Sequence, residues 1–163
     1  MKAVFFRHGP AVAHGTPGVA EDDRPLTPEG RKKTAEAARG LKELDLEPTL
    51  IYTSPLPRAM QTAEILSEIL HLARPRPLDA LRPGTPVRGL FSELRTHRGE
   101  MPVLVGHEPM LSAAVAFAIG GKAAIELKKA GMAFVEFTPG ASRPAGTLKM
   151  LLSPGVLRKL GRS

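Results

Sequence analysis

Three short apolar segments, each followed at once by a polar residue or glycine, constrain the fold of this chain most strongly. They are Lys2–Phe6, Thr49–Thr53 and Met101–Val105. Short continuous apolar runs of this kind are typical of strands that are buried on both faces of a sheet. Helical patterns fill the intervals between them, and strands that alternate with helices predict a parallel sheet. We therefore expect a three-layer α/β fold, with a mostly parallel central sheet and helices on both faces.

The helices have recognisable starts. Thr27 followed by Pro28 is a typical N-cap with proline at the first helical position. The expected helices span residues 28–44, 58–72, 87–98 and 109–119. A short strand is expected near 77–80, and the segments 133–137 and 147–152 predict a closing hairpin across the turn-rich stretch 139–146. No linker or internal repeat interrupts the pattern, so residues 1–163 are predicted to form a single domain.

Composition excludes several classes of function. The chain has no cysteine, which removes thiol catalysis, disulfides and cysteine-ligated metals. The net charge of +7 attracts anions, but the basic residues are spread along the chain and only 4% of residues are aromatic. Nucleic acid is therefore not expected as a partner. The apolar start ends at Phe6, too early for a secretory signal, and no later segment is apolar enough to span a bilayer, so we expect a cytoplasmic protein without membrane contact.

The polar clusters that follow the three strands are the candidate functional site. They are Arg7-His8-Gly9, Thr53-Ser54-Pro55-Leu56-Pro57-Arg58 and Gly106-His107-Glu108-Pro109. The carboxyl ends of parallel strands form one edge of a sheet, so these clusters are predicted to converge on one pocket. A neutral imidazole can attack phosphorus, and arginine forks match phosphoryl oxygens. A second histidine can donate a hydrogen bond to those oxygens, and Gly9 would leave room for the phosphate beside the nucleophile.

These motifs resemble those of a known family. "FFRHG", "RPLTPEG", "YTSPLPRAMQTAEIL" and "VLVGHEPML" occur in the order and spacing of the histidine phosphatase, or phosphoglycerate mutase-like, superfamily. A single Arg-His-Gly would be weak evidence, whereas four ordered blocks are strong. The short length resembles the small phosphohistidine phosphatase branch, the SixA type. The resemblance implies a phosphoglycerate mutase-like fold.

The resemblance also implies roles for individual residues. His8 would be the nucleophile, Arg7 and Arg58 would bind the phosphoryl group, and His107 would face its oxygens. Arg24 resembles a further substrate-side arginine of the small branch, although it could instead pair with Asp22 or Asp23. The family needs no metal or cofactor, and a zinc site on the two histidines is disfavoured because two arginines adjoin them. The remaining histidines, His14, His71 and His97, are expected at the surface.

The proton donor is the feature that departs from the larger branches of the family. They have a glutamate after the third strand, and the corresponding stretch 78–84 contains no clear match. Glu21, Asp22 and Asp79 are candidates for an acid or water-positioning group, and Asp23 and Glu93 are further acids nearby in sequence. An imidazole leaving group needs little help from an acid, so the missing glutamate favours phosphohistidine as substrate.

The expected function is metal-independent hydrolysis of phosphohistidine in a phosphoprotein, such as a histidine phosphotransfer domain. A phosphatase for small phosphorylated metabolites is the close alternative. A non-catalytic module that binds phosphate or nucleic acid is an alternative of another class, and it is the weaker one because pure binding needs no nucleophile at the end of a strand.

Overall fold

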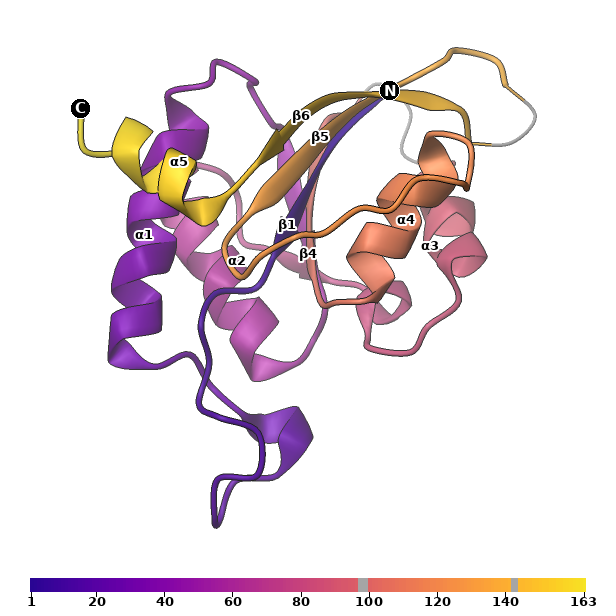
Figure 1. Ribbon diagram of the computed structural model, residues 1–163. Coiled ribbons are helices and arrows are strands. Elements are labelled where there is room, and N and C mark those ends of the chain that lie inside the picture. Colours follow the sequence, from indigo (N-terminus) through magenta and orange to yellow (C-terminus); the bar gives the residue numbers. More distant parts are fainter. Residues whose placement is uncertain (97–99, 142–143) are drawn as a thin grey trace.

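A mixed six-stranded sheet with helices on both faces forms the centre of the molecule (Figure 1). The computed structural model describes residues 1–96, 100–141 and 144–163. The strand order is β3-β2-β4-β1-β5-β6. The strands are β1 (Lys2–Arg7), β2 (Leu50–Thr53), β3 (Arg76–Pro77), β4 (Pro102–Gly106), β5 (Met132–Phe137) and β6 (Gly146–Leu152). The first four are parallel to one another, while β5 is antiparallel to both of its neighbours, β1 and β6. This arrangement confirms the predicted three-layer α/β architecture.

The helices divide between the two faces of the sheet (Figure 1). One face carries α1 (Pro28–Lys42), α2 (Pro57–Leu70) and α5 (Pro154–Leu160), and the other carries α3 (Val87–Leu94) and α4 (Met110–Ala118). Alternate residues of β1 serve the two layers: Val4 and Phe6 pack with the first group of helices, Ala3 and Phe5 with the second. Because both faces are covered, the strand reads as a continuous apolar run.

The predicted strand near 77–80 is shorter than expected. β3 contains only Arg76–Pro77, and Asp79–Leu81 form a 3-10 helix, η2. The chain turns here because Leu81 is completely buried under the sheet, close to Gly106. Helix α3 ends at Leu94, so the predicted helix to residue 98 was too long: residues 95 and 96 form a turn, and residues 97 and 98 lie outside the described ranges.

Helix α5 was not predicted, although its start carries the same signal as that of α1. Ser153 caps it by accepting a hydrogen bond from the Val156 N–H, and Pro154 occupies the first helical position. Glu36 of α1 accepts hydrogen bonds from Arg158 and Arg162, each 2.8 Å long. These hydrogen bonds lower the pKa of the Glu36 carboxyl to about 2. The basic end of the chain therefore anchors α5 on α1.

Candidate active site

The carboxyl ends of β1, β2 and β4 hold the three polar clusters together. Hydrogen bonds extend the sheet one residue beyond these strands: the His8 N–H donates to the Gly106 carbonyl at 3.0 Å, and the Ser54 N–H donates to the Val105 carbonyl at 2.9 Å. The backbone at the start of each cluster is thereby fixed to its neighbours. Segments that are about fifty residues apart in the chain meet at one edge, as the parallel arrangement requires.

His8 is held with one ring nitrogen free to react. Its side chain is buried, and its Nδ1 lies 2.7 Å from the carbonyl oxygen of Gly9. A carbonyl can only accept, so Nδ1 carries the proton and Nε2 carries the lone pair. Burial, which is opposed only in part by the Gly9 hydrogen bond, lowers the pKa of His8 to about 3. The imidazole is therefore neutral at neutral pH, the form that can attack phosphorus.

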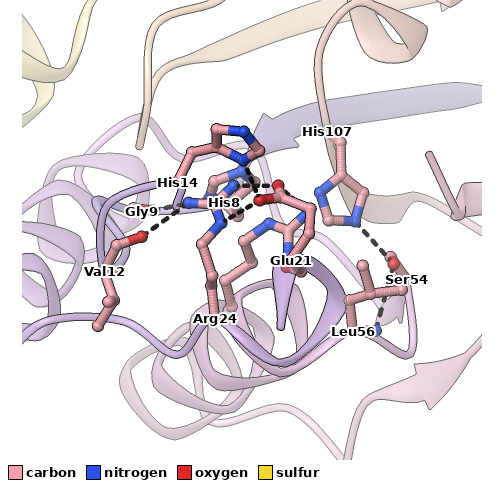
Figure 2. Close-up of polar contacts among 10 residues, drawn as sticks. His8, Gly9, Val12, His14, Glu21, Arg24, Ser54, Leu56 and His107 are labelled. Carbon is pink, nitrogen blue, oxygen red and sulfur yellow. Dashed lines mark hydrogen bonds and ion pairs between the residues drawn. The ribbon is translucent and has the colours of Figure 1, made fainter. Parts of the chain in front are cut away.

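His107 lies next to His8, with the ring centroids 5.2 Å apart. Its Nε2 is 2.8 Å from the hydroxyl of Ser54, while its buried Nδ1 has no hydrogen-bond partner in the described part of the chain and faces His8 (Figure 2). Ser54 also accepts from the Leu56 N–H at 3.3 Å, which leaves its hydroxyl proton free to point at Nε2. When the hydroxyl donates to Nε2, the His107 proton lies on Nδ1, where it can be donated to an oxygen bound beside His8.

Burial also lowers the pKa of His107 to about 3, with a smaller contribution from the positive charge of Arg58. Ser54 is completely buried and had no role in the sequence prediction. Its position directly after β2, in the same cluster as Arg58, was the signal that could have suggested one.

Two arginines lie beside the histidines, Arg58 buried and Arg7 half-buried. Arg58, on the first turn of α2, donates to the backbone carbonyl of Glu21 at 3.0 Å, and Arg7 donates to the carbonyl of Leu127 at 2.9 Å. The Nε atoms of both arginines are buried and have no hydrogen-bond partner among the described residues. Both positive charges act on His8 and oppose its protonation. Two cations with unfilled donors beside a neutral imidazole are groups that could bind a phosphoryl dianion.

Gly9 is required for a different reason from the one predicted. A Cβ at this position would lie 2.0 Å from Oγ1 of Thr34, so a side chain would collide with α1 rather than fill the pocket. The Gly9 N–H donates to Oγ1 of Thr62 at 2.9 Å. The glycine also contributes its carbonyl, which orients His8.

Arg24 pairs with Glu21, not with Asp22 or Asp23 as the sequence alone suggested. The guanidinium binds both carboxylate oxygens, at 3.0 and 2.6 Å, and also donates to the carbonyl of Val12 at 2.8 Å. These hydrogen bonds, led by those from Arg24 and followed by one from His14, lower the pKa of Glu21 to about 2. Glu21 is thus ionised at neutral pH and cannot supply a proton in this arrangement.

The other candidate acids lie at the surface. Asp22 is exposed, and the side chain of Asp79 is 86% exposed and is bound by Arg82 at 2.8 Å. His14 is exposed and His71 caps the C-terminal end of α2, both as expected, whereas His97 lies outside the described residues. Within the described ranges, no three histidine, aspartate or glutamate side chains are grouped so that they could hold a metal ion. No helix in that part of the chain is both long and apolar enough to cross a membrane.

The two buried histidines should make stability fall as the pH drops below 6.5. The unfolded chain takes up protons on these rings near pH 6.5, whereas the folded protein resists protonation until about pH 3. The free energy of unfolding should therefore decrease through this interval. The measurement is the melting temperature against pH. A variant with His8→Gln and His107→Gln should show a shallower decrease than a variant with His71→Gln, and equal slopes would contradict the assignment.

This fold and this set of side chains define a phosphoryl-transfer protein of the phosphoglycerate mutase-like class. Residues 3–83 match the histidine phosphatase superfamily (branch 1), and the chain belongs to this superfamily, whose members are phosphatases.

Known proteins resemble the chain over most of its length. An uncharacterized protein of Picosynechococcus sp. is 38% identical over 150 residues, covering 88% of each chain. The solved structure of the protein histidine phosphatase SixA complexed with tungstate is 25% identical, with a TM-score of 0.86 over 96% of this chain and 99% of that one. A phosphoserine phosphatase mutant of Entamoeba histolytica is 16% identical, with a TM-score of 0.72 over 96% and 98% of the two chains, and this likeness concerns the fold alone.

Proposed function

We propose that this chain is a metal-independent phosphatase that hydrolyses phosphohistidine in a phosphoprotein, such as a histidine phosphotransfer domain. The reaction would pass through an intermediate phosphorylated on Nε2 of His8. The observation that carries the proposal is the 2.7 Å contact between Nδ1 of His8 and the Gly9 carbonyl, because it assigns the proton to one nitrogen and the lone pair to the other. The absence of cysteine is compatible with the reducing cytoplasm, where we propose that the protein acts.

The neighbouring groups fit the first step of this mechanism. Nε2 of His8 attacks phosphorus, and the bond from phosphorus to the leaving nitrogen breaks with its electron pair going to that nitrogen. Arg7 and Arg58 bind the phosphoryl oxygens, and the Nδ1–H of His107 donates to one of them as charge shifts in the transition state. The phosphorylated His8 ring keeps its proton on Nδ1, which still donates a hydrogen bond to the Gly9 carbonyl.

The second step needs no additional acid. Water attacks the phosphorus of phospho-His8, and the ring departs as neutral imidazole because its other nitrogen already carries a proton. The proton of the attacking water leaves with the phosphate or passes to solvent. The Gly9 carbonyl therefore helps both steps, first by exposing the lone pair and then by holding the proton of the leaving ring.

The state of the candidate acids supports phosphohistidine over a phosphate ester. An alkoxide leaving group needs a proton from an acid, whereas a phosphohistidine that is protonated on its far ring nitrogen leaves as neutral imidazole. Glu21 is held ionised, and the carboxylate of Asp79 is turned toward Arg82 and solvent. The likeness to a protein histidine phosphatase at 25% identity supports the same substrate class.

A comparison of matched substrates tests the proposal. The wild-type protein is incubated with EDTA and a phosphohistidine-containing phosphotransfer domain, p-nitrophenyl phosphate or phosphoserine, and kcat/KM is measured for each. We expect the phosphohistidine protein to be the preferred substrate. Equal or faster turnover of the two esters would favour a phosphatase for small metabolites. Binding of phosphate without turnover of any of the three would favour a non-catalytic module.

A further inference from the structure

The carboxylate of Glu21 lies beside the candidate site, on the 3-10 helix η1 (Glu21–Asp23). It is 46% exposed, is bound through both oxygens by Arg24, and lies 2.5 Å from Nδ1 of His14 (Figure 2). One of its oxygens is also 3.9 Å from a terminal nitrogen of Arg58, whose other terminal nitrogen donates to the Glu21 carbonyl. Glu21 thus places a negative charge directly beside an arginine of the phosphoryl site.

Acidic groups also accompany the other arginine of the pocket. Glu108 and Glu126 act electrostatically on Arg7, and Asp22 joins Glu21 in acting on Arg58. Although the whole chain has a net charge of +7, each of these two guanidinium groups has carboxylates near it. The outer cation, Arg24, is paired with Glu21, so replacement of Glu21 by a neutral side chain would leave Arg24 as a further uncompensated positive charge here. The geometry therefore provides cations for one phosphoryl group and carboxylates around it.

We propose that Glu21 determines which substrates the site accepts, by favouring a positively charged leaving group and repelling a negatively charged one. This inference rests on the proposed function and narrows its substrate class to phosphoryl groups carried by a cationic group. The ring of phosphohistidine protonated on its far nitrogen is such a group. A carboxylate-bearing phosphometabolite is the opposite case, since it would bring a second negative charge toward Glu21.

The charge of Glu21 also assists the chemistry of the leaving ring. A carboxylate near the far nitrogen of the substrate imidazole stabilises the protonated form of that ring. As Nε2 of His8 bonds to phosphorus, the bond from phosphorus to the substrate nitrogen breaks, its electron pair stays on that nitrogen, and the proton stays on the other. The substrate leaves as neutral imidazole, so this reaction can use an ionised Glu21. An ester hydrolase would instead need a protonated carboxyl group to donate to its leaving group.

Binding of two small ligands tests this role without requiring turnover. O-phosphoethanolamine and phosphoglycolate have the same length but end in an amine and a carboxylate. Their dissociation constants are measured by calorimetry in a His8→Ala background, with and without Glu21→Gln. We expect the background protein to bind phosphoethanolamine more tightly, and Glu21→Gln to reduce this preference by about 5- to 10-fold, the size expected for one half-exposed charge a few ångströms from the ligand.

Inorganic phosphate and a control variant separate this role from damage to the pocket. The dissociation constant for phosphate reports whether the arginines remain in place after Glu21→Gln. Glu43→Gln makes the same change of charge at an exposed position, the C-terminal end of α1. It should leave the preference for phosphoethanolamine over phosphoglycolate unchanged. A preference that survives Glu21→Gln, or that Glu43→Gln reduces equally, overturns the inference. Because only binding is measured, either result stands whether or not phosphohistidine proves to be the preferred substrate.

Discussion

His8→Ala is expected to lower kcat for phosphohistidine hydrolysis by about 10,000-fold or more, the range seen when an essential nucleophile is removed. The expectation follows from the position of the ring: Nδ1 of His8 is bound to the Gly9 carbonyl, so Nε2 carries the lone pair. No phosphorylated protein intermediate should form in the variant. The measurements are the single-turnover rate and the transfer of labelled phosphate to the protein.

A matched histidine variant makes this result interpretable. His71→Ala removes an imidazole at the C-terminal cap of α2, on the far end of that helix from Arg58, and should retain full activity. Circular dichroism should show that both variants are folded. Turnover that persists in His8→Ala, together with labelled phosphate on another residue, would assign the nucleophile elsewhere.

Arg58→Ala is expected to have the second largest effect, a loss of about 1,000-fold in kcat/KM, as for arginines that stabilise the charge of a transferring phosphoryl group. The Arg58 side chain is only 4% exposed, so its charge acts in a poorly screened environment. Arg58→Lys should recover only part of the loss, because a lysine supplies the charge without the planar pair of donors.

The same variant should bind inorganic phosphate more weakly, which separates a loss of phosphate binding from a general loss of structure. Arg39→Ala removes an exposed arginine from α1 and serves as the control, with no change expected in either quantity. If Arg58→Ala lowered the melting temperature while kcat/KM and phosphate affinity stayed constant, Arg58 would be structural and the phosphate site would need another cation.

Features encoded locally could be predicted from the sequence. The buried strands β1, β2 and β4 appear as continuous apolar runs, and Thr27-Pro28 marks the start of α1. Their parallel order then brings His8, Arg58 and His107 to one edge of the sheet. The end of α3 and the turn at η2 were less predictable because they depend on which side chains the rest of the fold buries.

Partners of polar side chains were largely beyond prediction. Three acids precede Arg24 in sequence, and only the path of the loop selects Glu21 as its partner. The proton positions on the two active-site rings depend on the Gly9 carbonyl and the Ser54 hydroxyl, which are local in space but have no sequence signature. The sequence indicated that Gly9 matters. The reason that a side chain does not fit at this position is the close contact with Thr34, which forms only when α1 packs against the loop.

The order of strands has a consequence for how the protein is made. β4 pairs with both β1 and β2 and separates them, although it is the last of the three to leave the ribosome. A nascent chain that stops at residue 83, the end of the region matched by the family, contains β1 and β2 but lacks β4, the strand that lies between them. Such distant pairings slow folding. The chain should therefore emerge without a working site, and phosphatase activity should appear only after residue 107 has been synthesised and β4 has inserted between β1 and β2.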